Sequence, residues 1–185
     1  MYEIAKGSGT GEDYRAARFV LKAMSDDLTR PHLCVLHVEE LDSGSRLVCT
    51  DGRRLHVACI DATIPSGDYS PEVTKQTVYL REAEHGLAFP DWKKVVPDTV
   101  RKRGTITLAG ASFGRSSVQC SGLSIAFYTV IKKTGELVNL RYLDDLGKTD
   151  WEVFAQGEKH KALLFRHDEK GKESFAVIMP IDAAA

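Results

Sequence analysis

The first regular feature of the chain is a run of apolar residues at helical spacing. Four of them repeat at i, i+3, i+4 and i+7, namely Ala17, Val20, Leu21 and Met24. Residues at this spacing lie on one face of a helix, so the pattern predicts a helix over residues 12–27.

Extended runs rich in valine and leucine follow the predicted helix. Leu33–Glu40 and Arg46–Ile60 are typical of strands, and the Asp-Gly pair at positions 51–52 is a strong turn signal inside the second run. Residues 61–76 contain two prolines and few large apolar side chains, so they predict a loop.

The second half of the chain predicts mainly strands. Residues 89–97 carry a proline near each end and predict an extended connector with a central turn. Glycines separate three expected strands, at Thr105–Ala109, Ser117–Cys120 and Leu123–Ile131. Residues 139–147 predict a second, shorter helix with Asn139 as its N-cap, and further strands are expected after it.

This order of elements predicts an α+β fold, with two helices each packed on antiparallel strands. The two halves of the chain have similar content, which indicates a pseudo-repeat. We expect a single domain over residues 12–182, with a first half at about 12–98 and a second at about 99–182. Residues 1–11 and 183–185 are expected to be flexible ends.

Net charge limits the part that nucleic acid could play. The 185 residues have a formal net charge of −1, so no global attraction draws the chain to DNA. Contact with phosphates needs clustered lysines and arginines. We therefore expect any DNA contact to come from a local basic face.

Residues with metal-binding or catalytic chemistry do not form recognisable motifs. The cysteines lack CxxC spacing and the histidines lack HExxH spacing, so we expect neither a metal nor another cofactor. No spacing suggests a catalytic site, so we do not expect an enzyme; two converging titratable groups in a deep pocket would change that view. The chain has no signal-peptide pattern and no apolar run of membrane-spanning length, which indicates a cytoplasmic protein.

Four segments in order resemble the bacterial sliding clamp, the β subunit of DNA polymerase III. CTDGRRLHVA at 49–58 resembles the clamp's TDGHRLA, and FPDWKKVVP at 89–97 is similar to its FPDYRRVIP linker. AVIMPI at 176–181 resembles the closing strand VIMPM, and VNLRYLDDL at 138–146 resembles the helix start FNxxYLLDxL.

The resemblance implies a DNA-clamp-like fold and a non-catalytic role. In the family, helices line the inside of a ring through which DNA passes, and clients dock a short peptide in a surface cleft. A clamp chain has three such domains, so a closed ring would need more copies of this shorter chain, and a monomer without a ring is equally compatible with the sequence. Because Thr99 onward predicts a strand, we expect the helix that follows the family's linker to be missing.

The resemblance also assigns a peptide-binding cleft by position. Apolar side chains would form its floor, prolines would fix its backbone, and Arg54 and Lys94 would meet acidic groups or peptide carbonyls at its rim. The assigned residues are Thr50, Gly52, Arg53, Arg54, Leu55, Pro90, Lys94, Val95, Val177, Met179 and Pro180. Arg53 replaces the family's histidine, and Ile181 and Asp182 replace methionine and arginine after the last segment.

A basic stripe on the first helix is the candidate DNA face. Arg15, Arg18 and Lys22 lie at i, i+3 and i+7, and Arg141 and Lys148 would act alike on the second helix. A solvated helix face is the alternative interpretation of such a stripe.

Two functional hypotheses follow. The first is a sliding-clamp-like replication accessory that binds DNA polymerase or other replication and repair proteins through short peptides, and duplex DNA as a homo-oligomer. The alternative is a clamp-fold interaction module or regulator that does not bind DNA. Salt-dependent DNA binding would separate the two hypotheses.

Overall fold

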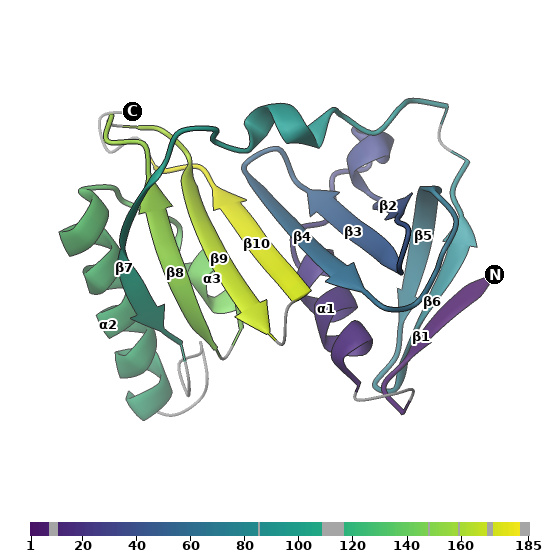
Figure 1. Cartoon of the computed structure of the whole chain (residues 1–185), viewed down its shortest axis with the longest axis horizontal. Coiled ribbons are helices and arrows are strands. Elements are labelled where there is room, and N and C mark those ends of the chain that lie inside the picture. Colours follow the sequence, from purple (N-terminus) through teal and green to yellow (C-terminus); the bar gives the residue numbers. More distant parts are fainter. Residues whose placement is uncertain are drawn as a thin grey trace. The chain divides into compact units, whose positions relative to one another are not determined.

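The computed structural model describes residues 1–7, 11–84, 86–108, 117–147, 149–158, 160–169 and 172–181. The chain forms two compact units (Figure 1). Unit 1 comprises Met1–Asp91 and Asp168–Ser174, and unit 2 comprises Trp92–His167 and Phe175–Ala185.

Unit 1 is an antiparallel sheet with one helix packed on it. Its elements in chain order are β1 (Tyr2–Ala5), α1 (Glu12–Leu21), the 3-10 turn η1 (Pro31–Leu33), β2 (Leu36–Glu40), β3 (Ser45–Thr50), β4 (Arg54–Ile60), β5 (Gly67–Val73) and β6 (Thr77–Glu82). The strands lie side by side in the order β1-β6-β5-β2-β3-β4.

Helix α1 covers β3 and β4 with its apolar face. Ala17 and Val20 on that face are fully buried, as are Leu47 of β3 and Ala58 of β4 in the same core. The regular helix ends at Leu21 rather than at residue 27, because the next three amides bond to carbonyls three residues earlier. Such i→i−3 bonds tighten the last turn and stop α-helical propagation.

Unit 2 has its own antiparallel strands with two helices. Its elements are the 3-10 turn η2 (Trp92–Val95), β7 (Arg101–Thr107), α2 (Ser117–Thr134), α3 (Leu140–Asp145), β8 (Asp150–Ala155), and most of β9 (Leu163–Glu169) and β10 (Lys172–Ile178). The strands lie in the order β10-β9-β8-β7. Figure 1 shows α2 alongside β7 and β8.

The predicted strands at Ser117–Cys120 and Leu123–Ile131 are wrong, because both segments belong to helix α2. Leu123, Ala126 and Val130 lie at i, i+3 and i+7 and are buried, which is a helical pattern. Further apolar residues between them hide that pattern in the sequence. The expected absence of a helix after the connector is therefore also wrong, since α2 follows β7.

Two further segments differ from prediction in unit 1. The expected loop at 61–76 contains strand β5, in which Pro71 lies opposite Leu80 of β6. The start of the chain, expected to be flexible, forms β1, whose residues pair with β6 from Tyr2 to Ala5. Residues 8–10 and 182–185 lie outside the described residues.

The short helix and the α+β class are confirmed. Helix α3 is capped as predicted, since the Asn139 side chain accepts a hydrogen bond from the Arg141 amide at 3.0 Å. Both units also follow the same order of elements: one strand, then helix, then antiparallel strands. In unit 1 the order is β1-α1-β2-β3-β4, and in unit 2 it is β7-α2-α3-β8-β9-β10. This is the predicted pseudo-repeat of halves.

Within the described residues, no helix is long and apolar enough to cross a membrane. The same residues hold no group of three or more His, Cys, Asp or Glu side chains placed to bind a metal ion.

Candidate functional site

The turn between β3 and β4 is closed by its own side chains. The Thr50 hydroxyl donates to the Arg54 carbonyl oxygen at 2.6 Å and accepts from the Gly52 amide at 3.1 Å. Gly52 has φ of 86°, a left-handed conformation that favours glycine. Thr50 and Gly52 therefore shape the turn.

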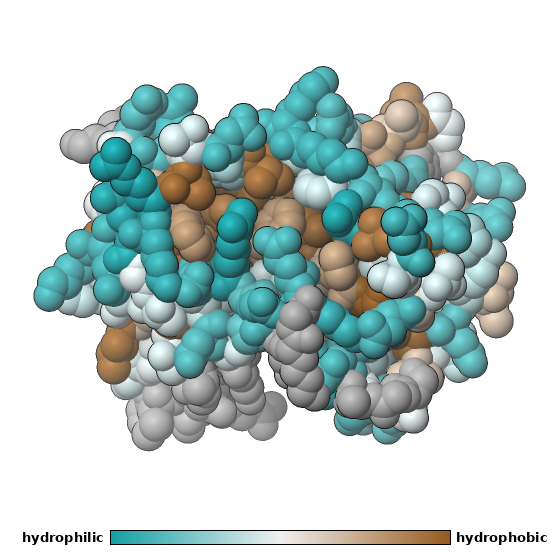
Figure 2. All heavy atoms as spheres, viewed as in Figure 1, coloured by the Kyte–Doolittle hydropathy of each residue, from teal (hydrophilic) through white to brown (hydrophobic). Residues whose placement is uncertain are grey.

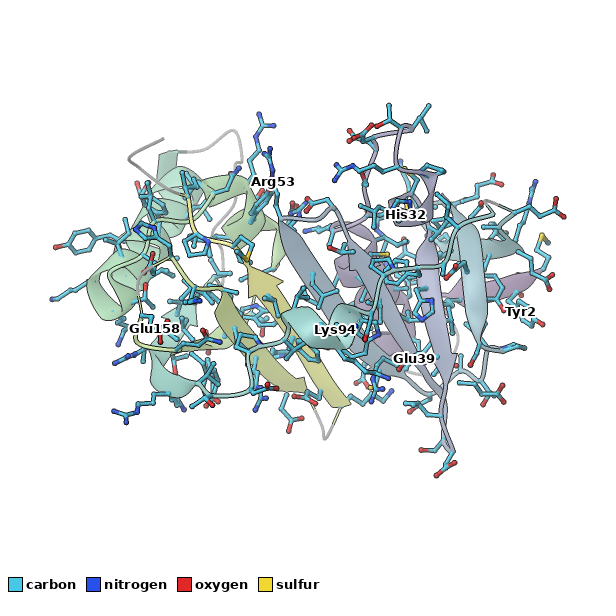
Figure 3. All side chains as sticks on the ribbon, turned by 90° about the horizontal axis from the view of Figure 1, so that it is seen from above. Tyr2, His32, Glu39, Arg53, Lys94 and Glu158 are labelled. Atoms are coloured by element: carbon cyan, nitrogen blue, oxygen red, sulfur yellow. The ribbon has the colours of Figure 1, made fainter. Side chains whose placement is uncertain are left out.

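Asp51, which the sequence analysis did not select, organises the same turn. Its carboxylate accepts from the Arg53 amide at 2.8 Å, the Arg54 amide at 3.0 Å and Arg54 Nε at 3.1 Å. Arg54 also donates to the main-chain oxygen of Lys22 at the end of α1. Arg54 thus ties the turn to the helix, whereas Arg53 is exposed and projects from the ribbon (Figure 3).

The strand after this turn is buried. Leu55 is 1% exposed and belongs to the interior of unit 1. His56 beside it is fully buried, and burial lowers its pKa to about 3. Its Nδ1 donates to the Phe19 carbonyl oxygen at 2.8 Å, so β4 is fixed to α1 next to the turn.

Pro90 lies on a segment that is anchored to unit 1. The ring of Phe89 stacks on His37 with centroids 4.6 Å apart, and His37 Nδ1 lies 2.7 Å from the Asp68 carboxylate. Pro90 itself is exposed. The stacked pair holds the start of the connector on β2 and β5.

In unit 2, the turn η2 packs against β10. Trp92 is 8% exposed, and its ring lies 6.2 Å from the ring of Phe175. Two apolar side chains near this contact are exposed. Val95 on η2 is 54% exposed, and Met179, which directly follows β10, is 45% exposed. In Figure 2 apolar side chains gather over the upper part of β9 and β10.

The remaining predicted residues of unit 2 are close neighbours of Val95 and Met179 in the sequence. Lys94, labelled on η2 in Figure 3, is exposed, Pro180 is half-buried and Val177 is 3% exposed. Ile181 is 43% exposed, and its amide donates to the Leu137 carbonyl oxygen at 2.7 Å. That bond fixes the chain end that carries Met179 and Pro180.

The predicted cleft residues are divided between the two units. Thr50, Gly52, Arg53, Arg54, Leu55 and Pro90 lie in unit 1, and Lys94, Val95, Val177, Met179 and Pro180 lie in unit 2. The predicted residues thus belong to two separate features: a closed, hydrogen-bonded turn in unit 1, and the exposed apolar side chains of Val95 and Met179 in unit 2.

The predicted basic stripe is exposed on α1. Arg15, Arg18 and Lys22 are all exposed, and the Arg18 guanidinium lies over the Tyr14 ring at 5.9 Å. Arg18 Nη1 also donates to the Tyr14 hydroxyl at 3.3 Å. The stripe is thus partly ordered by its own helix.

The second part of the predicted DNA face is on α3 in unit 2. Arg141 is exposed there, beside the half-buried Asp144 and Asp145 on the same short helix. Lys148 lies outside the described residues.

No protein-family model matches the sequence, and no curated protein matches it. Solved structures of bacterial sliding clamps do match its fold. The Thermotoga maritima DNA polymerase III β subunit superposes with a TM-score of 0.63 at 15% identity, over 98% of this chain and 65% of that one. The Pseudomonas aeruginosa subunit gives a TM-score of 0.63 at 17% identity, over 98% and 66%.

A third match is the C. crescentus β sliding clamp, with a TM-score of 0.60 and 18% identity over 99% of this chain and 66% of that one. This chain therefore has the sliding-clamp fold, and it spans about 65% of the length of the clamps it matches.

Proposed function

We propose that this chain is a sliding-clamp-like replication accessory that binds client proteins through short peptide segments and catalyses no reaction. The observation that carries the proposal is the exposure of Val95 and Met179, at 54% and 45%, on elements held together by Trp92 and Phe175. Exposed apolar side chains that gather into a patch, as they do over β9 and β10 in Figure 2, mark protein-binding surfaces.

The chemistry of this group suits a varied set of peptides. Methionine adapts its shape to different apolar partners, and the flanking Pro180 limits the backbone freedom that binding would otherwise remove. Lys94 adds a positive charge on the same turn as Val95. The clients we propose are DNA polymerase or other replication and repair proteins.

Unit 1 carries other predicted binding residues on the β3–β4 turn. Arg53 is its exposed cation, and the hydrogen bonds of Thr50 and Asp51 hold the turn in one conformation. Leu55 and Arg54 would act indirectly, by keeping the turn and the strand behind it in place.

Direct binding of a fluorescent peptide of the Gln-Leu-x-Leu-Phe type tests this proposal. We expect saturable binding that weakens by about tenfold or more in a Val95→Ser, Met179→Ala double variant, since buried anchors of an interface each contribute over 1 kcal/mol. A Leu87→Ala variant is the matched control, because Leu87 is 55% exposed on another segment. Unchanged affinity in the double variant, or no binding by folded protein, would refute the peptide site.

Duplex DNA is the second ligand that we propose, through the α1 stripe. Arg15, Arg18 and Lys22 lie on one exposed face, and three phosphate contacts predict a log–log salt slope of about −3. Arg15→Glu with Arg18→Glu should abolish that slope, whereas Lys75→Glu on the β5–β6 turn should not. Light scattering would show whether DNA binding accompanies a homo-oligomer.

A clamp-fold interaction module without DNA binding is the alternative function. The net charge of −1 favours it, because a chain without overall positive charge gains little from phosphate contact. Peptide binding without salt-sensitive DNA binding would select this alternative.

A further inference from the structure

Helix α2 buries one apolar face and exposes two large apolar side chains on the other. Leu123, Ala126 and Val130 are buried against unit 2, with exposures of 1%, 2% and 0%. Ile125 and Tyr128 point away from that core and are 68% and 65% exposed. Ser121 and Ser124 are exposed on the same helix, so its outer face combines two large apolar side chains with small polar ones. Large apolar side chains normally lie on the face of a helix that packs on protein, so Ile125 and Tyr128 are unusual on the outer face.

The outer faces of α1 and α2 differ in the side chains that they carry at equally spaced positions. The outer stripe of α1 holds Arg15, Arg18 and Lys22 at i, i+3 and i+7, and the same spacing on α2 holds Ile125, Tyr128 and Lys132. Two cations of the α1 stripe are thus replaced by two large apolar groups on α2, and the third position keeps its positive charge. The α2 stripe therefore has the composition of a protein-docking surface with a basic end.

The segment of sequence that contains the stripe has only basic charged residues. Residues 99–135 contain no Asp or Glu and six cations: Arg101, Lys102, Arg103, Arg115, Lys132 and Lys133. Because the whole chain has a net charge of −1, the other residues carry an excess of seven negative charges. The positive charge is concentrated in the segment that contains β7 and α2.

At the last turn of α2, the Lys133 side chain reaches strand β7. A Cβ atom at Gly104 of β7 would lie 2.7 Å from the Cδ and Cε atoms of Lys133, so the Lys133 side chain crosses the strand. Arg101 lies opposite the buried Ala155 of β8, on the side of the strands that α2 covers. Lys102 pairs with Glu152 on the other side.

We propose that the outer face of α2, with the basic end formed by Lys132, Lys133 and Arg101, docks a protein segment that carries apolar side chains flanked by carboxylates. Apolar groups of the partner would cover Ile125 and Tyr128, and its carboxylates would meet the three cations. Charge complementarity selects an acidic segment. Ile125 is aliphatic and offers no ring for a base to stack on, so it favours the apolar side chains of a protein over a nucleic-acid strand.

This docking surface is separate from the proposed client-peptide site. It uses α2 and β7, whereas Val95 and Met179 lie on η2 and after β10. Either surface can fail its test without affecting the other.

A fluorescent amphipathic peptide of about 14 residues, with leucine on one helical face and glutamate elsewhere, is the probe. We expect saturable binding to the full chain that weakens by about tenfold or more in an Ile125→Ser, Tyr128→Ser double variant. Lys132→Glu should also weaken peptide binding, and the loss of affinity should be larger at low salt than at high salt. The control is a Val73→Ser, Leu87→Ser double variant, which removes two exposed apolar groups elsewhere.

Three results would overturn the proposal. One is the absence of saturable binding by folded wild-type protein. Another is equal or tighter binding of the same peptide with lysine in place of glutamate. The third is tighter binding of an oligothymidine strand that the Ile125→Ser, Tyr128→Ser variant leaves unchanged but Lys132→Glu weakens, which would assign the face to nucleic acid.

Discussion

His56 of β4 and Phe19 of α1 are stacked, with ring centroids 4.4 Å apart and 11° between the ring planes. His56 Nδ1 donates to the Phe19 carbonyl oxygen, and among the described residues its Nε2 has no hydrogen-bond partner. The ring is fully buried, so a second proton on it would enter the core without a partner. The nearby positive charges of Arg54 and Lys22 oppose protonation as well.

The stability of unit 1 should therefore depend on pH through His56. Burial lowers its pKa from 6.5 to about 3 in the folded chain. Below the unfolded value the unfolded chain binds a proton that the folded chain rejects, so the free energy of unfolding falls as pH falls from about 6.5 toward about 3. The slope is about 1.4 kcal/mol per pH unit.

Urea unfolding between pH 7 and pH 4.5 measures this slope. Carboxylates also titrate there, so the informative quantity is the difference between the wild type and His56→Gln. The variant should lose the histidine contribution and show the shallower dependence. Identical slopes would mean that His56 is protonated in the folded state or that its environment differs from this packing.

Gly44, before β3, should tolerate no side chain. It has φ of 85°, and a Cβ atom there would collide with the Ile60 carbonyl oxygen. Gly44→Ala should therefore lower the free energy of unfolding by more than about 2 kcal/mol, from backbone strain plus steric overlap. Chemical denaturation provides the measurement.

Gly135 separates the two contributions to that loss. It has φ of 77°, but an added Cβ there meets nothing within 4 Å. Gly135→Ala should cost only the left-handed backbone strain of about 1–2 kcal/mol. An equal cost at both positions would show that the Gly44 site relaxes around the methyl group.

The Lys172 ammonium joins three carboxylates in unit 1. It lies 2.6 Å from Asp61, 3.3 Å from Asp13 and 3.8 Å from Glu12, and Asp13 also accepts from the amides of Asp61 and Ala62. Lys172→Met would leave these like charges uncompensated, and we expect a loss of about 1–2 kcal/mol. The loss should shrink in 1 M salt, where the Debye length is about 3 Å.

Unfolding at low and at high salt distinguishes this ion-pair effect from lost packing. Lys75→Met is the comparison, because Lys75 is an exposed lysine on the β5–β6 turn. A loss in Lys172→Met that is independent of salt would point to the aliphatic part of the side chain instead.

Local signals in the sequence predicted the local structure well. The Asp-Gly turn, the start of α1 and the Asn139 cap depend on residues a few positions apart, so the sequence contains their causes. Helix α2 was missed because Ile125 and Tyr128 fill the polar positions of its pattern. Both residues are exposed, so they lie outside the core although they are apolar, and periodicity cannot separate exposed from buried apolar residues.

The candidate site was predictable only in part. Similar motifs indicated which residues to consider, but not their exposure. Arg54 is held in hydrogen bonds to the turn and to α1, and Leu55 is buried, whereas Val95 and Met179 face outward. Exposure depends on packing between elements far apart in the chain, for example Trp92 on Phe175. A linear motif does not carry that information.

Leu55 and Met179 should consequently behave differently when truncated to alanine. Leu55 is 1% exposed, so Leu55→Ala should lower the free energy of unfolding by about 2–5 kcal/mol through lost burial and a cavity. Met179 is 45% exposed, and Met179→Ala should cost less than about 1 kcal/mol of unfolding free energy while weakening peptide binding.

Denaturation curves and peptide titrations on both variants, at a temperature where both are folded, separate stability from binding. If folded Leu55→Ala binds the peptide as weakly as Met179→Ala does, Leu55 shapes the binding surface as well as the core. If Met179→Ala loses stability and keeps its affinity, the exposed apolar group of unit 2 serves folding, and the peptide site must be sought elsewhere.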